Sequence, residues 1–128
     1  MKPEDLMVGD WFRFRYTIDG KEIVHTFRIS RIEDELGDYY VWGKGFGRMC
    51  YPKRLEPISI TPEILEKNGF EEFDGWRILD MDDVEIRWIG TILEISGSYG
   101  NIELPNVQCV HELQHALRLC GIDKEIVI

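Results

Sequence analysis

The stretch that decides the fold of the first half is DWFRFRYTI, residues 10–18, in which apolar and polar side chains alternate. The two sets fall on opposite sides of the chain: Phe12, Phe14, Tyr16 and Ile18 against Arg13, Arg15 and Thr17. A period of two is typical of a strand with one buried face. Because Asp19-Gly20 is a hairpin signal and a second alternating run follows over 22–32, the sequence predicts a β-hairpin.

The remainder of the first half is also predicted to consist of β-strands. Two more short strand patterns, 39–42 and 46–51, flank the glycines of 43–45, and no helical pattern occurs before residue 60. Several short strands without a helix predict a small, strongly bent β-sheet or barrel over 1–58.

The second half mixes helices and strands. Thr61-Pro62 is a helix start with a capping hydroxyl, and Asn68-Gly69 ends that helix. Strand patterns separated by turn signals follow at 76–79, 84–89, 91–95 and 102–104. A long helix is predicted from about Asn106 to Cys120, and the last residues, IDKEIVI, are expected to form a docked tail or an edge strand. We describe this half as an α-β-β-β-α unit with an antiparallel sheet.

The predicted fold class is therefore α+β, with the β half, 1–58, packed against the α+β half, 59–128. The junction over 55–61 is short and apolar, whereas a flexible linker would be rich in glycine and serine. We expect the halves to form one compact unit that unfolds cooperatively.

The two halves differ in net charge. The net charge is −9, and residues 57–128 carry five Lys or Arg against fourteen Asp or Glu, whereas 1–56 carry ten of each. An acidic chain is a poor general binder of nucleic acid. There is no apolar run of membrane-spanning length and no signal-peptide pattern, and the three cysteines form no C-x-x-C. We expect a cytoplasmic protein with reduced thiols and no membrane association.

One pentapeptide in the second half suggests a specific chemistry: His111-Glu112-Leu113-Gln114-His115 matches H-E-x-x-H. Two histidines four residues apart share a helix face and can chelate one zinc, while the glutamate activates a metal-bound water. The alternative function is therefore a zinc-dependent hydrolase or peptidase with His111 and His115 as ligands and Glu112 as the base.

The surroundings of the pentapeptide argue against a metal site. A catalytic zinc needs a third protein ligand, and the positions that follow His115 offer Arg118 and Gly121 where an extended pattern would place glycine and histidine. His25 lies in a strand pattern as a core-facing or rim residue. By helical period the two motif histidines lie about 100° to 170° from the apolar stripe. We therefore predict a plain surface helix with no cofactor, and we lean away from an enzyme.

The segment KGFGRMCY, residues 44–51, partly matches the RNA-recognition strand K-G-F-G-F-V-x-F/Y. Arg48 stands where that motif has a key aromatic, and no helix pattern precedes the strand. A glycine-rich hairpin is the simpler interpretation. A nucleic-acid accessory role through the basic-aromatic segment 44–54 remains a weaker alternative.

Three segments carry a resemblance that extends over nearly the full length: PEDLMVGDW at 3–11, LEPISITPEILEKNGF at 55–70 and VHELQHAL at 110–117. With them the chain resembles a family of small uncharacterised bacterial proteins encoded largely in prophages and integrated mobile elements of gut bacteria. The family pattern in the helix is closer to V-H-x-L-Q-N/H, which implies that Glu112 and His115 are not fixed positions. The resemblance implies a setting and no activity.

These observations favour a non-enzymatic interaction or accessory protein of a mobile element that binds an unidentified protein partner. Aromatic and basic side chains of the first half are the candidate contacts, since such residues often anchor interfaces. The partner-binding candidates are Trp11, Trp42, Lys44, Phe46 and Arg48. Nucleic acid is an unlikely partner on charge grounds, and the oligomeric state is left open.

Overall fold

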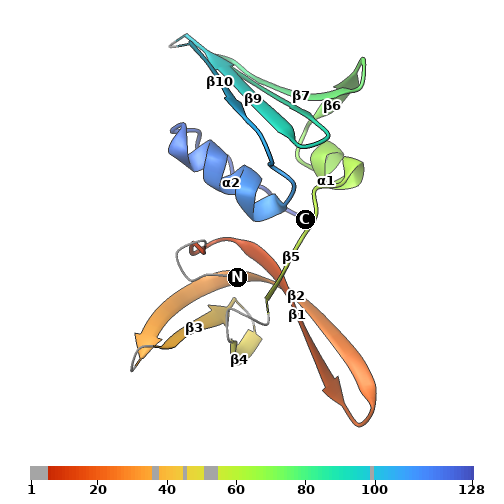
Figure 1. The fold of residues 1–128 in the computed structure, drawn as a ribbon, viewed down its shortest axis with the longest axis vertical. Coiled ribbons are helices and arrows are strands. Elements are labelled where there is room, and N and C mark those ends of the chain that lie inside the picture. Colours follow the sequence, from red (N-terminus) through yellow and green to blue (C-terminus); the bar gives the residue numbers. More distant parts are fainter. Residues whose placement is uncertain (1–5, 36–37, 45, 51–54, 99) are drawn as a thin grey trace. The chain divides into compact units, whose positions relative to one another are not determined.

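The computed structural model describes residues 6–35, 38–44, 46–50, 55–98 and 100–128, with the side chains of 34, 35, 38, 39 and 46–50 left out of that description. The chain divides into two compact units, Met1–Ile58 (unit 1) and Ser59–Ile128 (unit 2) (Figure 1). Each unit is built on one antiparallel sheet, and both helices found in the described residues belong to unit 2, so the α+β class is confirmed.

Unit 1 is a five-stranded sheet in the order β4-β3-β2-β1-β5. Its strands are β1 (Trp11–Ile18), β2 (Lys21–Glu35), β3 (Asp38–Gly43), β4 (Phe46–Cys50) and β5 (Leu55–Pro57). Asp19 and Gly20 both have positive φ, 51° and 76°, as a tight hairpin turn between β1 and β2 requires. β2 pairs with β1 along its first part and with β3 along its second, with a register shift between Ile29 and Arg31. The sheet is bent, and β4 and β5 remain its two edges, so among the described strands it does not close into a barrel.

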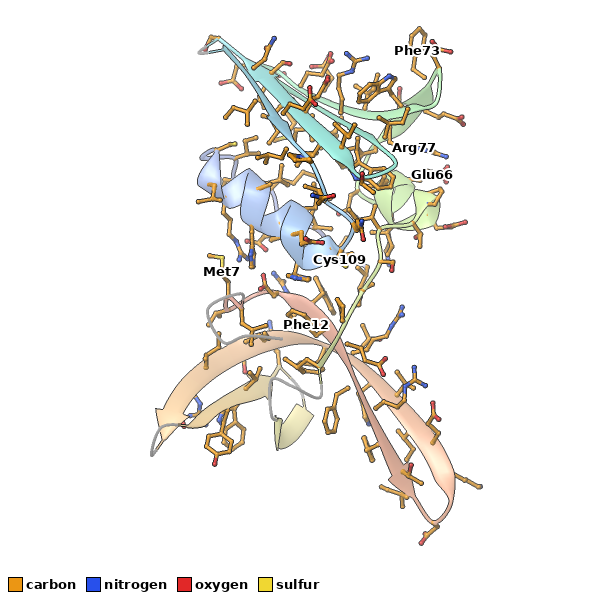
Figure 2. All side chains as sticks on the ribbon, in the orientation of Figure 1. Met7, Phe12, Glu66, Phe73, Arg77 and Cys109 are labelled. Carbon is orange, nitrogen blue, oxygen red and sulfur yellow. The ribbon has the colours of Figure 1, made fainter. Side chains whose placement is uncertain are left out.

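The core of unit 1 uses the predicted alternation of β1. Phe12, which Figure 2 labels, is fully buried, and it lies opposite Phe27 in the β1–β2 pairing. The core side chains are Leu6, Phe12, Phe14, Phe27, Ile29, Val41 and Leu55. Asp10 is also fully buried, and its carboxylate accepts the Met7 backbone N–H at 2.8 Å. Because its carbonyl accepts the Ile29 N–H at 2.8 Å, this turn fixes the start of β1 against β2.

Unit 2 is a β-meander in the order β10-β9-β8-β7-β6, with α1 and α2 on one face of the sheet (Figure 1). Its elements are α1 (Pro62–Lys67), β6 (Glu71–Phe73), β7 (Trp76–Met81), β8 (Val84–Ile89), β9 (Ile92–Gly97), β10 (Gly100–Leu104) and α2 (Val110–Leu119). The predicted helix start is confirmed, since the Thr61 side chain accepts the Ile64 N–H at 3.2 Å. The sheet has five strands, two more than the α-β-β-β-α description implies. The strand patterns at 76–79, 84–89, 91–95 and 102–104 correspond to β7–β10, and only the short exposed strand β6 has no predicted counterpart.

α2 begins later than the sequence indicates. Asn106 has a φ of 62°, outside the helical region, and Cys109 is extended and forms a β-bridge with Ser59. The Val107 N–H donates to the Thr91 carbonyl at 2.7 Å, and the Gln108 carbonyl accepts the Ile60 N–H at 2.9 Å. These tertiary hydrogen bonds hold the backbone extended up to the N-cap, Cys109.

The tail after α2 is docked without forming a strand, because two buried carboxamides take the place of strand partners. Asn68 donates to the Val127 carbonyl at 2.7 Å and accepts the Val127 N–H at 2.8 Å. Gln114 donates to the Lys124 carbonyl at 2.9 Å and accepts the Ile126 N–H at 2.7 Å. Between these clamps the Ile126 side chain is fully buried. Of the two predicted forms, the docked tail is confirmed and the edge strand is wrong.

The clamp yields a first prediction. Asn68→Ala leaves the N–H and carbonyl of Val127 without their side-chain partners, and we expect the free energy of unfolding to fall by about 2–4 kcal/mol. Urea denaturation followed by circular dichroism measures this change. The control is Asn101→Ala on an exposed position of β10, with an expected change of about 0.5 kcal/mol or less. Equal losses in the two variants would contradict the role of Asn68.

Candidate functional site

The glutamate of the H-E-x-x-H match is part of a helix cap. Glu112 Oε1 accepts the backbone N–H of Cys109 at 2.9 Å and that of Gln108 at 3.2 Å. Glu112 is the third residue of α2, where a carboxylate that reaches back to the N-cap backbone satisfies groups that the helix leaves unpaired. In this geometry Glu112 stabilises the start of α2 and is not directed at a water between the two histidines.

The two motif histidines lie together on α2 in an edge-to-face arrangement, with ring centroids 5.7 Å apart. His111 is buried at 8% exposure, and His115 is half-buried. The prediction of a plain surface helix is therefore wrong for His111. The helical period correctly separates it from the apolar stripe of Leu113 and Leu117, but that separation does not leave the ring in water.

Within the described part of the chain, no group of three or more His, Cys, Asp or Glu side chains is arranged to hold a metal ion. His25, the remaining histidine, belongs to unit 1 and lies opposite Phe14 in the β1–β2 pairing. Its ring stacks on Tyr16 with centroids 5.5 Å apart, and its Nε2 lies 2.8 Å from the Tyr16 hydroxyl. The histidines thus have local structural contacts, and a third ligand beside His111 and His115 is not found in the described residues.

Cys109 is the other reactive side chain at the start of α2. Partial burial, followed by the charge and the hydrogen bond of Glu112, raises the pKa of its thiol to about 11. At neutral pH the thiol is therefore protonated and a weak nucleophile. Capping, rather than nucleophilic chemistry, is the role that this cluster of side chains supports.

A different surface gathers the aromatic and basic candidates. The strand register places six side chains on the face of the unit 1 sheet opposite its core, and we call this the arginine–tryptophan face. It consists of Trp11, Arg13 and Arg15 on β1, Arg28 and Arg31 on β2, and Trp42 on β3. The fully buried Val41 next to Trp42 points the other way, as alternation requires.

Both tryptophans of this face are covered by arginines from the neighbouring strand. The Arg28 guanidinium carbon lies 5.5 Å from the Trp11 ring centroid, and that of Arg31 lies 4.5 Å from the Trp42 ring centroid. Each pair is also a direct cross-strand pair in the register. The tryptophans are half-buried, so each presents part of an indole together with a positive charge, which is the geometry of a cation–π contact.

The arginines are partly balanced by carboxylates. Arg15 Nε donates to Glu56 at 2.9 Å, and Arg15 also pairs with Glu22. The hydrogen bond from Arg15 holds the pKa of Glu56 below its ordinary value, although burial acts in the opposite sense. Arg31 lies 3.0 Å from Glu33. The face is therefore mildly positive, with arginines held in place by acidic neighbours.

The structure brings only some of the predicted contact residues together. Trp11 and Trp42 share the arginine–tryptophan face, and Lys44 is exposed after β3. The Phe46 and Arg48 side chains lie outside the described residues. Sequence reasoning did not predict Arg28 and Arg31 as contacts. The positions of these two arginines depend on the register of β2 and on the register shift between Ile29 and Arg31. No local sequence pattern predicts that shift.

Comparison with protein-family models, with curated proteins and with solved structures found no match to this chain. The helices in the described ranges are all too short or too polar to span a membrane. Functional inference therefore depends on the geometry of this chain alone.

The H-E-x-x-H match yields a second prediction. Protein expressed with zinc and purified by gel filtration is expected to hold no stoichiometric zinc, because Glu112 is engaged as a cap and the residues that the structure describes offer no third ligand beside the histidines. Elemental analysis of wild type and His115→Ala measures this. One tightly held zinc per wild-type chain, lost in His115→Ala, would restore the hydrolase alternative.

A third prediction concerns Cys109. We expect its alkylation by iodoacetamide, followed by peptide mapping, to keep accelerating up to pH 10, because its thiol has a pKa of about 11. Glu112→Gln removes a negative charge beside the thiol and should move the rate profile to lower pH. A profile that levels off near pH 8.5 in wild type, as for an ordinary thiol, would contradict the arrangement.

Proposed function

We propose that this chain is a non-enzymatic interaction protein and that the arginine–tryptophan face of unit 1 contacts an acidic protein partner. The observation that carries the proposal is the pair of cross-strand stacks, Arg28 on Trp11 and Arg31 on Trp42. Tryptophan and arginine are the side chains most enriched among residues that dominate binding energy. An arginine already ordered on an indole also loses less freedom when a carboxylate pairs with it.

A protein partner fits this face better than a nucleic acid does. Its four arginines share the outer surface with Glu22, Glu33 and Glu56, and the whole chain has a net charge of −9. Polyanion binding gains its affinity from many phosphate contacts at once, and this surface offers few uncompensated cations. Specific pairing with a limited number of carboxylates needs only the charges that are present.

The zinc hydrolase is the less supported function. It requires a base and three ligands, and Glu112 is held by the Cys109 and Gln108 N–H groups. We further propose that the protein is cytoplasmic and that it belongs to a bacterial mobile element, the setting that the family resemblance implies. Both would place the partner among host or element proteins.

The test compares two matched arginine–tryptophan stacks. Arg31→Ala removes the arginine 4.5 Å from Trp42 on the proposed face, and Arg87→Ala removes one 4.6 Å from Trp76 in unit 2. Each tagged protein is incubated with bacterial lysate, and an acidic protein that wild type retains is then purified and titrated. We expect Arg31→Ala to weaken its binding roughly tenfold or more and Arg87→Ala to leave it unchanged. Added salt should weaken the wild-type complex.

Two outcomes would contradict the proposal. The first is a retained protein whose affinity is the same for wild type and Arg31→Ala. The second is submicromolar, salt-sensitive binding of labelled oligonucleotides that is lost in Arg31→Ala, measured by fluorescence anisotropy. That result would assign the same face to nucleic acid.

A further inference from the structure

The sheet of unit 2 extends further than the helix that covers it. The register aligns Ile86, Ile95 and Ile102 in one row on the face that packs toward α2. Exposure rises along this row from 0% at Ile86 through 4% at Ile95 to 47% at Ile102. α2 ends at Leu119, and Gly121, with a φ of 72°, turns the chain away. The row therefore begins in the core and ends in an uncovered apolar side chain.

A cavity of about 440 Å³ lies at this uncovered end, entirely within unit 2. Its walls come from the β7–β8 turn, the ends of β9 and β10, and the chain just after α2. The volume falls in the range of small-molecule sites, which is roughly 300–1,000 Å³. The space beside Gly100 and Gly121 in its lining is open, since a Cβ at either position would meet no atom within 4 Å.

The lining of the cavity defines the chemistry of a ligand. Most of its side chains are apolar or sulfur-containing: Met81, Val84, Ile95, Ile102, Cys120 and Ile122. The charged ones are Asp83 and Asp123, both exposed, and the described lining contains no Lys, Arg or His. An apolar floor with two carboxylates and no cation favours a ligand with an apolar body and a positive charge.

We propose that this cavity binds a small organic cation, namely a protonated alkyl- or arylamine, with its apolar part against Ile95 and Ile102 and its ammonium group between Asp83 and Asp123. The contact would cover Ile102, the end of the apolar row that α2 leaves exposed. Anionic molecules of the same size are excluded by the two carboxylates. The site is independent of the arginine–tryptophan face, because it belongs to the other unit.

Three probes of equal length test the proposal: hexylamine, hexanol and hexanoate, titrated by ligand-observed NMR against the full chain at pH 7. Hexylamine is expected to bind most tightly and hexanoate least. The double variant Asp83→Asn/Asp123→Asn should weaken hexylamine binding by about fivefold or more, the loss expected of partly exposed ion pairs, and leave hexanol unchanged. Asp80→Asn, on the opposite face of the sheet, is the matched control and should change neither.

A filling variant tests the position of the apolar part. Ile102→Trp places a larger side chain at the mouth and should abolish binding of hexylamine and hexanol together, while circular dichroism confirms that the variant is folded. Equal binding of hexylamine and hexanoate, no binding of any probe, or hexylamine binding that survives the double aspartate variant would each overturn the proposal. The aspartate variants decide it even if Ile102→Trp does not fold.

Discussion

Each sheet of this protein has one face packed into a core, and that constraint decides which side chains are left for contact. In unit 1 the alternation of β1 buries Phe12 and places Arg13 on the opposite face. In unit 2 both helices pack on one face, and the other face carries the half-buried Trp76 and an exposed Phe73 (Figure 2). Tryptophan on an open sheet face leaves apolar area in water, and each unit reduces that cost by laying an arginine across the ring.

Local structural hydrogen bonds explain why a peptidase-like pentapeptide has no peptidase geometry. A glutamate three residues after an N-cap satisfies the first backbone groups of a helix, and this requirement alone accounts for Glu112. Gln114, in the same pentapeptide, is used to clamp the tail. Two of the five residues therefore have structural hydrogen bonds that a motif search does not reveal.

The sequence predicts those parts of the structure that depend on neighbouring residues. The β1–β2 hairpin and the Thr61 cap follow from alternation, turn residues and capping chemistry, and both are confirmed. The start of α2 could not be predicted, because it depends on hydrogen bonds to distant segments. The burial of His111 is likewise not indicated by the helical period. The arginine–tryptophan face could be predicted only in part. The alternation of β1 shows on which face Arg13 lies, whereas the positions of Arg28 and Arg31 follow only from the strand register.

The tail clamp and the cavity of unit 2 are two consequences of one chain path. For Asn68 and Gln114 to reach the backbone of the tail, the chain must reverse soon after α2, and Gly121 provides the turn. A helix continued by one more turn would advance about 5.4 Å along its axis and carry the chain past this reversal. The early turn that secures Ile126 therefore leaves the end of the apolar row at Ile102 without a helical cover. The open end of the sheet is thus a cost of docking the tail, and a ligand that covered Ile102 would offset it without disturbing the clamp.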